Sequence, residues 1–300
     1  MTPSALPDII CIGSVLWDYI GRSDRSTSRG ADEPGRITRV PGGVAMNIAM
    51  TMRRFGMKST LLTAIGNDPA GEELLEMAEE LGIDVEHVFR SPALPTDRYL
   101  AIEDADGLVS AVADARTLEA AGNKILEPLL DGRLGSEQRP WTGLIAVDGN
   151  LTQALLSHIA TSPLLAHADL RVAPASPGKV DRLKPLLTHP RVTLYANLAE
   201  ATLLCGRAVD TAPAAAEALL DLGAQRILVT DGARDCADGL FREGVLVARP
   251  RTVQVKRVTG AGDTFMGAHI FAERNGATRA DALAAAIRVA ADYVGGEIGS

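Results

Sequence analysis

Short apolar segments alternate with longer amphipathic segments along most of the chain. Six of the apolar segments are hydrophobic nearly throughout and favour β-branched residues: Ile9–Ile12, Leu61–Ile65, Leu144–Val147, Leu170–Val172, Val192–Tyr195 and Ile227–Thr230. Continuous apolar runs of this length are typical of parallel strands that are covered on both faces. They therefore predict the buried strands of a central sheet.

Amphipathic segments with helical spacing lie between these runs. Three of them end directly before a glycine: Val44–Phe55, Gly71–Leu81 and Ala214–Leu222. A glycine in that position is the usual left-handed cap of a helix. Strands and helices that alternate in this way predict a doubly wound α/β fold, in which helices flank a mostly parallel central sheet.

Two regions depart from this alternation and predict a smaller sheet. Ile37–Val40 alternates polar and apolar residues, as do Arg98–Glu103 and Leu108–Ala113 on either side of a short turn. This period is typical of half-exposed antiparallel strands. We interpret residues 20–41 and 96–114 as lid strands that project from the sandwich, although an ordinary surface hairpin fits the pattern equally well.

Composition narrows the class of protein. The 300 residues carry a net charge of −8 without a basic tract, which argues against a nucleic-acid partner. A large α/β domain often has this length, so we expect one domain over residues 1–300. The sequence has neither a long uninterrupted apolar run nor the features of a signal peptide at its start, so we expect a cytoplasmic protein without a membrane partner.

One glycine-rich segment points to phosphate chemistry. Thr259-Gly260-Ala261-Gly262-Asp263 is followed by helical spacing over Thr264–Arg274. Small residues let backbone amides approach a phosphate, and a helix start adds free N–H groups and a partial positive charge. Asp263 would lie in the first turn, where a carboxylate can accept the proton of an attacking hydroxyl. The alternative is a glycine-rich turn that an aspartate caps.

The wider sequence resembles the ribokinase-like (PfkB) family of carbohydrate and nucleoside kinases. Pro41-Gly42-Gly43-Val44-Ala45-Met46-Asn47 resembles the first signature of that family, and Thr259–Asp263 resembles the second. The resemblance implies that Gly42 and Gly43 approach the substrate and that Asn47 hydrogen-bonds its hydroxyl groups. It also implies an anion hole and a catalytic base in the second signature: the amides of Gly260, Ala261 and Gly262, and the carboxylate of Asp263.

Three further elements match the family in the same order along the chain. Asp18 matches the aspartate that holds sugar hydroxyls, and Asn197 and Glu200 match an Asn-x-x-Glu motif that organises magnesium and phosphate. Thr230 and Gly232 match a turn that lines the nucleotide site. The resemblance therefore implies ATP and Mg²⁺ as cofactors, with Glu200 acting on the metal indirectly.

Several less specific similarities concern the molecule that accepts the phosphoryl group. The segments Thr96–Ile102, Gly107–Val109, Ala111–Asp114, Val147–Leu151 and Pro174–Lys179 are similar to pseudouridine kinases. They imply transfer to the 5′-hydroxyl of pseudouridine, with lid residues contacting the base. Two alternatives remain open: a kinase of a free sugar or sugar phosphate, and a catalytically inactive sugar- or nucleoside-binding regulatory protein.

Two departures from the family pattern bear on recognition. Leu16 stands where many relatives have an asparagine, and Trp17 follows it, so we expect Trp17 to stack on a base or close one side of the pocket. Arg257 stands where relatives often have an acidic residue near a monovalent-cation site. We hypothesise that its guanidinium replaces potassium. Lids in this family often pair, and the alternating strands would permit a homodimer.

Overall fold

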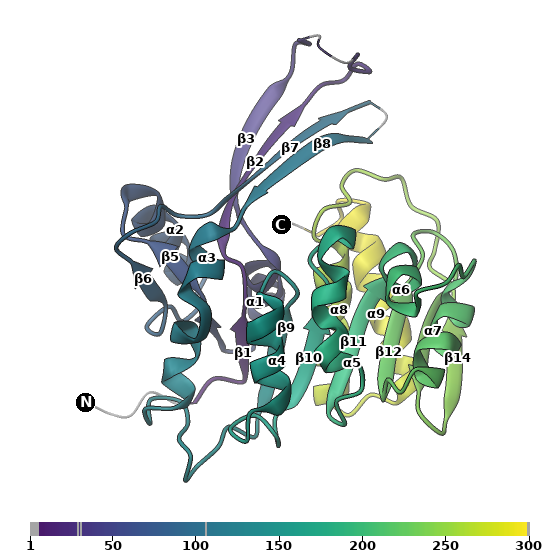
Figure 1. Ribbon diagram of the computed structural model, residues 1–300. Helices are drawn as coiled ribbons and strands as arrows, with labels where there is room; N and C mark the ends of the chain where they lie inside the picture. Colours follow the sequence, from purple (N-terminus) through teal and green to yellow (C-terminus); the bar gives the residue numbers. More distant parts are fainter. Residues whose placement is uncertain (1–5, 29, 31, 106, 299–300) are drawn as a thin grey trace.

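A central eight-stranded sheet organises the protein. The computed structural model describes residues 6–28, 30, 32–105 and 107–298. The strand order is β14-β13-β12-β11-β10-β9-β1-β4, and all strands from β4 to β12 are parallel (Figure 1). Their bounds are β1 Ile9–Ile12, β4 Ser59–Leu62, β9 Leu144–Asp148, β10 Asp169–Ala173, β11 Val192–Asn197, β12 Arg226–Thr230, β13 Cys236–Leu240 and β14 Gly244–Ala248. The predicted doubly wound α/β fold is confirmed.

Helices cover both faces of this sheet (Figure 1). One face carries α1 Val44–Arg54, α2 Pro69–Glu80, α8 Ala261–Arg274 and α9 Arg279–Val294. The other carries α3 Arg116–Ala121, α4 Gln153–Thr161, α5 Lys184–Leu187, α6 Leu198–Cys205 and α7 Ala212–Asp221, with 3-10 helices at Gly122–Leu129 and Pro177–Leu183. Alternate residues of β1 enter the two cores, which explains its unbroken apolar sequence.

The predicted helix ends agree with the structure to within two residues. Gly56, Gly82 and Gly223 each follow their helix with a positive φ, of 78°, 75° and 100°. A side chain is strained in that conformation, so glycine ends these helices at low cost. At the start of α2 the Asp68 side chain accepts a hydrogen bond from the Gly71 amide at 2.8 Å. None of the helices in the described part of the chain is long and apolar enough to cross a membrane.

A separate four-stranded sheet, sheet B, projects from the sandwich in the order β3-β2-β7-β8 (Figure 1). Its strands are β2 Leu16–Arg22, β3 Arg36–Gly42, β7 Arg98–Asp104 and β8 Gly107–Asp114. The alternating segments are thus confirmed as a small sheet rather than a lone hairpin. The interpreted lid strands, which began at residue 20, covered only the end of β2; the mixed sequence of residues 16–19 joins the strand by pairing with β3 and β7.

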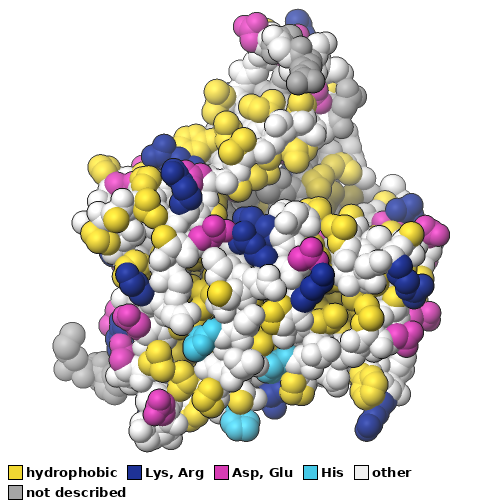
Figure 2. All heavy atoms as spheres, in the orientation of Figure 1, with side chains coloured by type: hydrophobic (Ala, Val, Ile, Leu, Met, Phe, Trp, Pro, Cys, Tyr) yellow, Lys and Arg dark blue, Asp and Glu magenta, His cyan; other side chains and the backbone are white. Residues whose placement is uncertain are grey.

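The two faces of sheet B differ in character. Asp18, Ile20 and Arg22 share one face with Thr38 and Val40 on the paired strand. The opposite face carries apolar residues that are largely exposed: Ile37, Leu100, Ile102 and Val112. Hydrophobic side chains gather over this projecting part of the molecule on the side that Figure 2 shows.

The predicted strand Leu61–Ile65 is wrong as a single element. The segment is divided between β4, in the central sheet, and β5 Ala64–Gly66, which pairs with β6 Phe89–Ser91 in a two-stranded sheet. Thr63 lies between them and is fully buried. Both strands are buried, so the sequence stays apolar at the point where the chain passes from one sheet to the other. The apolar run therefore did not reveal the break.

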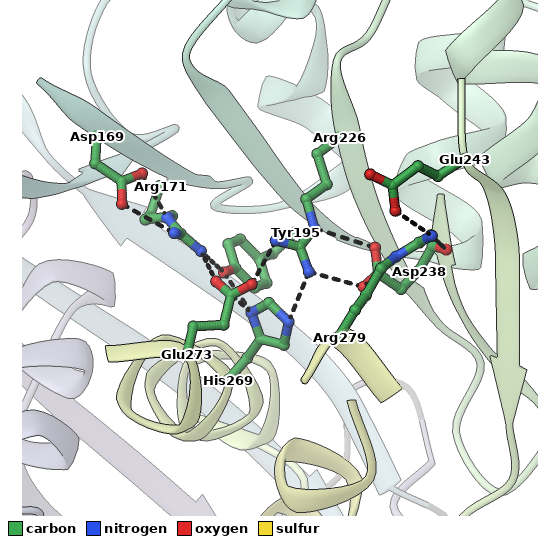
Figure 3. Close-up of polar contacts among 9 residues, drawn as sticks. All are labelled: Asp169, Arg171, Tyr195, Arg226, Asp238, Glu243, His269, Glu273 and Arg279. Atoms are coloured by element: carbon green, nitrogen blue, oxygen red, sulfur yellow. Dashed lines mark hydrogen bonds and ion pairs between the residues drawn. The ribbon is translucent and has the colours of Figure 1, made fainter. Parts of the chain in front are cut away.

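A buried ionic network fastens the second half of α8 to the central sheet (Figure 3). Glu273 of α8 accepts hydrogen bonds from Arg171 of β10 and Arg226 of β12. His269, one turn earlier, lies 2.9 Å from the Tyr195 hydroxyl. Burial opposes ionisation of Glu273, yet the two guanidinium groups lower its pKa to about 2. Burial lowers the pKa of His269 to about 4, so its ring is neutral at pH 7.

We expect the Glu273→Ala substitution to lower the free energy of unfolding by about 2–3 kcal/mol, because Arg171 and Arg226 each lose one of two carboxylate partners and keep only Asp169 and Asp238. The matched control is Glu72→Ala, which removes an exposed partner of Arg90 and costs at most about 1 kcal/mol. Urea denaturation at pH 7 measures both values. Equal losses in the two variants would contradict a stabilising role for the network.

Candidate active site

A cleft with a volume of about 1080 Å³ lies between sheet B and the helices of one face of the sandwich. Residues of β2 and β3 line one side of it, and residues of α1, the end of α2 and the start of α8 line the other. Parts of both predicted signatures meet here. The lining residues nearest to them are Asp18, Asn47, Thr259, Gly260, Thr264 and Tyr293.

The glycine-rich segment forms the start of α8, as predicted. Gly260 precedes the helix in the left-handed region, with φ of 82°. The Tyr293 hydroxyl donates to the Thr259 carbonyl at 2.8 Å, and a Cβ on residue 260 would lie 2.8 Å from the same hydroxyl oxygen. Only glycine therefore fits this turn. The Ala261 amide donates to the Val258 carbonyl at 3.0 Å, so the amides of Gly262 and Asp263 are the better candidates for binding an anion.

Asp263 lies in the first turn of α8 and contacts the other signature. The Asn47 side-chain amide donates to Asp263 Oδ2 at 2.8 Å across 216 residues of sequence. Burial raises the pKa of Asp263 to about 7, and the carboxylates of Asp148, Glu200 and Asp18 add to the rise while Asn47 opposes it. A carboxylate with this pKa can accept a proton at neutral pH.

The paired glycines of the first signature make room for polar atoms. A Cβ on residue 42 would lie 2.1 Å from Asp18 Oδ2, and one on residue 43 would lie 2.4 Å from the Ser14 carbonyl oxygen. Gly43 also has φ of 94°. Asp18 itself is buried, which raises its pKa to about 7. The turn therefore holds the Asp18 carboxylate against the backbone that starts α1.

A hydrogen-bond network below this turn was not assigned from the sequence. The Ser14 hydroxyl donates to Asp148 Oδ2 at 2.5 Å and accepts from the Val44 amide at 3.0 Å and from Asn150 Nδ2 at 2.9 Å. Lys179 in turn donates to Asn150 Oδ1 at 2.6 Å. The network positions the start of α1. Asp148, Asn150 and Lys179 fall in two segments singled out for their similarity, but nothing local showed that they meet Ser14.

The Asn-x-x-Glu motif forms a capping box at the start of α6. The Asn197 side chain accepts from the Glu200 amide and the Glu200 carboxylate accepts from the Asn197 amide, both at 2.9 Å. Burial raises the pKa of Glu200. Among the described residues there is no cluster of three or more His, Cys, Asp or Glu that could hold a metal. A single carboxylate still fits Mg²⁺, which proteins commonly bind through one or two carboxylates and the phosphates of the substrate.

The predicted nucleotide residues are not among the residues that line the cleft. Asn197 ends β11 and pairs with Thr230 at the end of β12. Gly232 follows in the left-handed region, with φ of 57°. The carboxyl ends of parallel strands share one edge of the sheet, so these residues lie on the same edge as Ser14 and Asp148.

The structure shows where Trp17 and Arg257, the residues tied to the two departures from the family pattern, lie. Trp17 does not line the cleft: it is 1% exposed, its indole donates to the Ala70 carbonyl at 2.8 Å, and Arg39 covers its ring. It lies on the face of β2 opposite Asp18, so the expectation that it stacks on a base is wrong. Arg257 lies over the Tyr293 ring and donates to the backbone carbonyls of Tyr293 and Ile298.

Sequence comparison places nearly all of the chain in one family. Residues 6–296 match the model of the pfkB family carbohydrate kinases. The chain is 30% identical to a pseudouridine kinase of Escherichia coli over 267 aligned residues. The aligned region covers 86% of this chain and 81% of that protein. The chain is also 30% identical over 288 residues to an uncharacterized sugar kinase of the same organism, covering 94% of this chain and 76% of that one.

Solved structures share the fold. A carbohydrate kinase from Agrobacterium tumefaciens superposes with a TM-score of 0.77 at 26% identity, over 95% of this chain and 90% of that one. A ribokinase of Arabidopsis thaliana, complexed with ribose and ATP, gives a TM-score of 0.76 at 19% identity over 99% of this chain and 94% of its own. Fold and family together define a phosphotransferase with an alcohol group as acceptor. The chain belongs to the pfkB family of carbohydrate kinases.

We expect Gly260→Ala to lower turnover by about 10–100-fold, because the added methyl displaces the start of α8 from its position over the cleft. The left-handed backbone adds a cost of about 1–2 kcal/mol in stability. Gly276→Ala is the matched control, since its φ is 81° but nothing lies within 4 Å of the added atom. Steady-state kinetics and thermal unfolding of both variants measure the difference. An equal loss of turnover in the control would contradict the positional argument.

Proposed function

We propose that this protein transfers the γ-phosphoryl group of ATP to the 5′-hydroxyl of pseudouridine or a closely similar nucleoside. One observation carries the reaction type: the partly buried Asp263 carboxylate, at the start of α8, contacts Asn47 of the opposing signature beside the cleft. The similarity to a pseudouridine kinase supports the choice of acceptor.

The residues divide the work of the reaction between them. Asp18 and Asn47 face the hydroxyl groups of the acceptor, and Asp263 takes the proton of the attacking hydroxyl. ATP with Mg²⁺ supplies the phosphoryl group, and Glu200 is the carboxylate available to the metal through water. The first amides of α8 stabilise the charge on the transferred group, since they point along the positive end of the helix dipole. Phosphoryl transfer requires little more than such positioning and charge stabilisation.

The decisive experiment is ADP release with ATP and Mg²⁺ across pseudouridine, uridine, adenosine, ribose, fructose and fructose phosphate. We expect turnover with pseudouridine to exceed turnover with each of the sugars. Preference for a free sugar or sugar phosphate would keep the chemistry and overturn the acceptor. ATP binding without ADP release would indicate a regulatory protein that binds its ligands without catalysis.

Asp263→Asn is the matched variant for this assay. It preserves the size of the side chain but removes the base, so we expect turnover to fall by about 10²-fold or more while ATP still binds. Near-normal turnover would rule out Asp263 as the base.

The raised pKa of Asp263 predicts the pH dependence. Only the ionised carboxylate accepts a proton, so kcat/KM rises with pH, reaches half its maximum near the pKa of about 7, and levels off above it. Asn47→Ala moves the midpoint to higher pH, because the hydrogen bond from Asn47 lowers the pKa. A pH–rate profile of both proteins measures the midpoints. A flat profile across neutral pH would show that another group takes the proton.

We further propose that Arg257 makes the enzyme independent of potassium. Its guanidinium already donates to the backbone carbonyls of Tyr293 and Ile298, and the Tyr293 hydroxyl in turn holds the turn at Thr259. Carbonyl oxygens are also the groups that bind alkali cations. We expect equal activity in potassium, sodium and choline chloride at one ionic strength, and reduced activity in Arg257→Gln. Several-fold activation of the unmodified enzyme by potassium would contradict this role.

A further inference from the structure

All four strands of sheet B meet the sandwich at the same end of that sheet (Figure 1). At this end a single residue separates β3 from α1, and a single residue separates β8 from α3. Asp18 lies near this end of β2, lines the cleft, and is close enough to Asp263 for its charge to raise the pKa of that carboxyl. The angle at which sheet B leaves the sandwich therefore decides where the Asp18 carboxylate lies relative to the start of α8.

Asp97 joins several of these strands at their common end. It lies directly before β7 and is 4% exposed. Its carboxylate accepts hydrogen bonds from the amides of Thr117 at 2.8 Å and Leu118 at 3.0 Å, in the first turn of α3. Its carbonyl oxygen accepts from the Trp17 amide of β2 at 3.3 Å. One residue thus connects β2, β7 and the helix that follows β8.

The bonds from α3 to Asp97 replace a cap that the local sequence lacks. Ala115 stands at the N-cap of this helix, and its methyl group cannot accept a hydrogen bond. The first amides of a helix have no partner within the helix, so a buried helix start needs an acceptor from elsewhere. Asp97 supplies this acceptor with a negative charge that complements the positive end of the helix. The start of α3 and the base of β7 are therefore held by the same carboxylate.

The residue before Asp97 is anchored in the opposite direction. The Thr96 hydroxyl donates to Asp68 Oδ1 at 2.5 Å, and the Thr96 amide donates to Asp68 Oδ2 at 2.9 Å. Asp68 caps α2, which packs on one face of the sandwich, whereas α3 packs on the other. Two consecutive buried residues thus tie the start of β7 to helices of both faces. The start of β7 is therefore held against rotation toward either face.

We propose that Asp97 is a positioning residue for acceptor binding, because it holds sheet B at the angle that keeps the Asp18 carboxylate in the cleft. This rests on the proposed function, in which Asp18 and Asn47 face the hydroxyl groups of the acceptor. The residues assigned to ATP include Asn197 and Thr230, which end β11 and β12 in the central sheet. A change in the angle of sheet B does not move them. Loss of the Asp97 contacts therefore weakens binding of the acceptor and spares binding of ATP.

The test compares the KM for the acceptor with the KM for ATP in Asp97→Asn. The amide keeps the size of the side chain, but its NH2 group cannot accept, so one of the two bonds from α3 is lost. Loss of a hydrogen bond to a charged group corresponds to about tenfold in an equilibrium constant. We expect the KM for pseudouridine to rise about tenfold while the KM for ATP stays within about twofold of that of the unmodified enzyme.

Asp84→Asn is the matched control. The Asp84 carboxylate also accepts from a backbone amide, that of Glu86 at 2.9 Å, and from the Thr60 hydroxyl at 2.7 Å, but none of these three residues belongs to sheet B or lines the cleft. We expect both KM values to stay unchanged in this control. Equal rises of the two KM values in Asp97→Asn would show that the residue supports the fold in general, and would overturn the proposal. An unchanged KM for pseudouridine would overturn it as well.

Two measurements without turnover separate this inference from the proposed function. If the unmodified protein turns over none of the acceptors, the proposed function fails, and calorimetric titration with pseudouridine decides the role of Asp97. Weaker binding in Asp97→Asn than in Asp84→Asn supports that role, whereas equal binding or no binding overturns it. Hydrogen exchange covers the case in which Asp97→Asn does not fold. Rapid exchange of the Thr117 and Leu118 amides in the unmodified protein overturns the proposal, because amides that Asp97 holds exchange slowly.

Discussion

The close approach of α1 and α8 is the constraint on which the site depends. A Cβ on Gly267 would lie 2.5 Å from Thr51 Cγ2, so only glycine lets the two helices pack at this separation. One turn nearer the sheet edge, the same approach brings Asn47 within 2.8 Å of Asp263. A wider spacing would separate the two signatures and break the Asn47–Asp263 contact on which the proposed reaction rests.

The position of α8 is set at both ends. Tyr293 fixes the turn that precedes it, and the buried carboxylate of Glu273 ties its second half to strands β10 and β12. Burying so many charges is expensive unless every one is paired, and such networks favour a single arrangement when they are. The two attachments together fix the amides and the aspartate at the start of α8 in one position over the cleft. Figure 3 shows the attachment at Glu273.

Electrostatics and geometry act together at Asp263. The packing that places its carboxylate beside Asn47 also removes it from water and surrounds it with the carboxylates of Asp18, Asp148 and Glu200. Burial and each neighbouring carboxylate raise the pKa of Asp263 toward 7. In the proposed reaction the N–H groups in the first turn of the same helix supply the partial positive charge that stabilises the phosphoryl group. A base and an anion site can therefore share one helix start.

The sequence by itself determined the parts of this protein that local preferences control. Apolar runs predicted the central strands, glycines predicted the helix ends, and the spacing after Gly260 predicted that Asp263 lies in the first turn of a helix, because each of these depends on residues a few positions apart. The tertiary structure decided the rest. It made residues 16–19 the first half of β2, divided residues 61–65 between two sheets, buried Trp17 away from the cleft, and joined Ser14 to Asp148 and Asn150. These outcomes depend on which distant segments pack together, and no pattern within one segment records its partner.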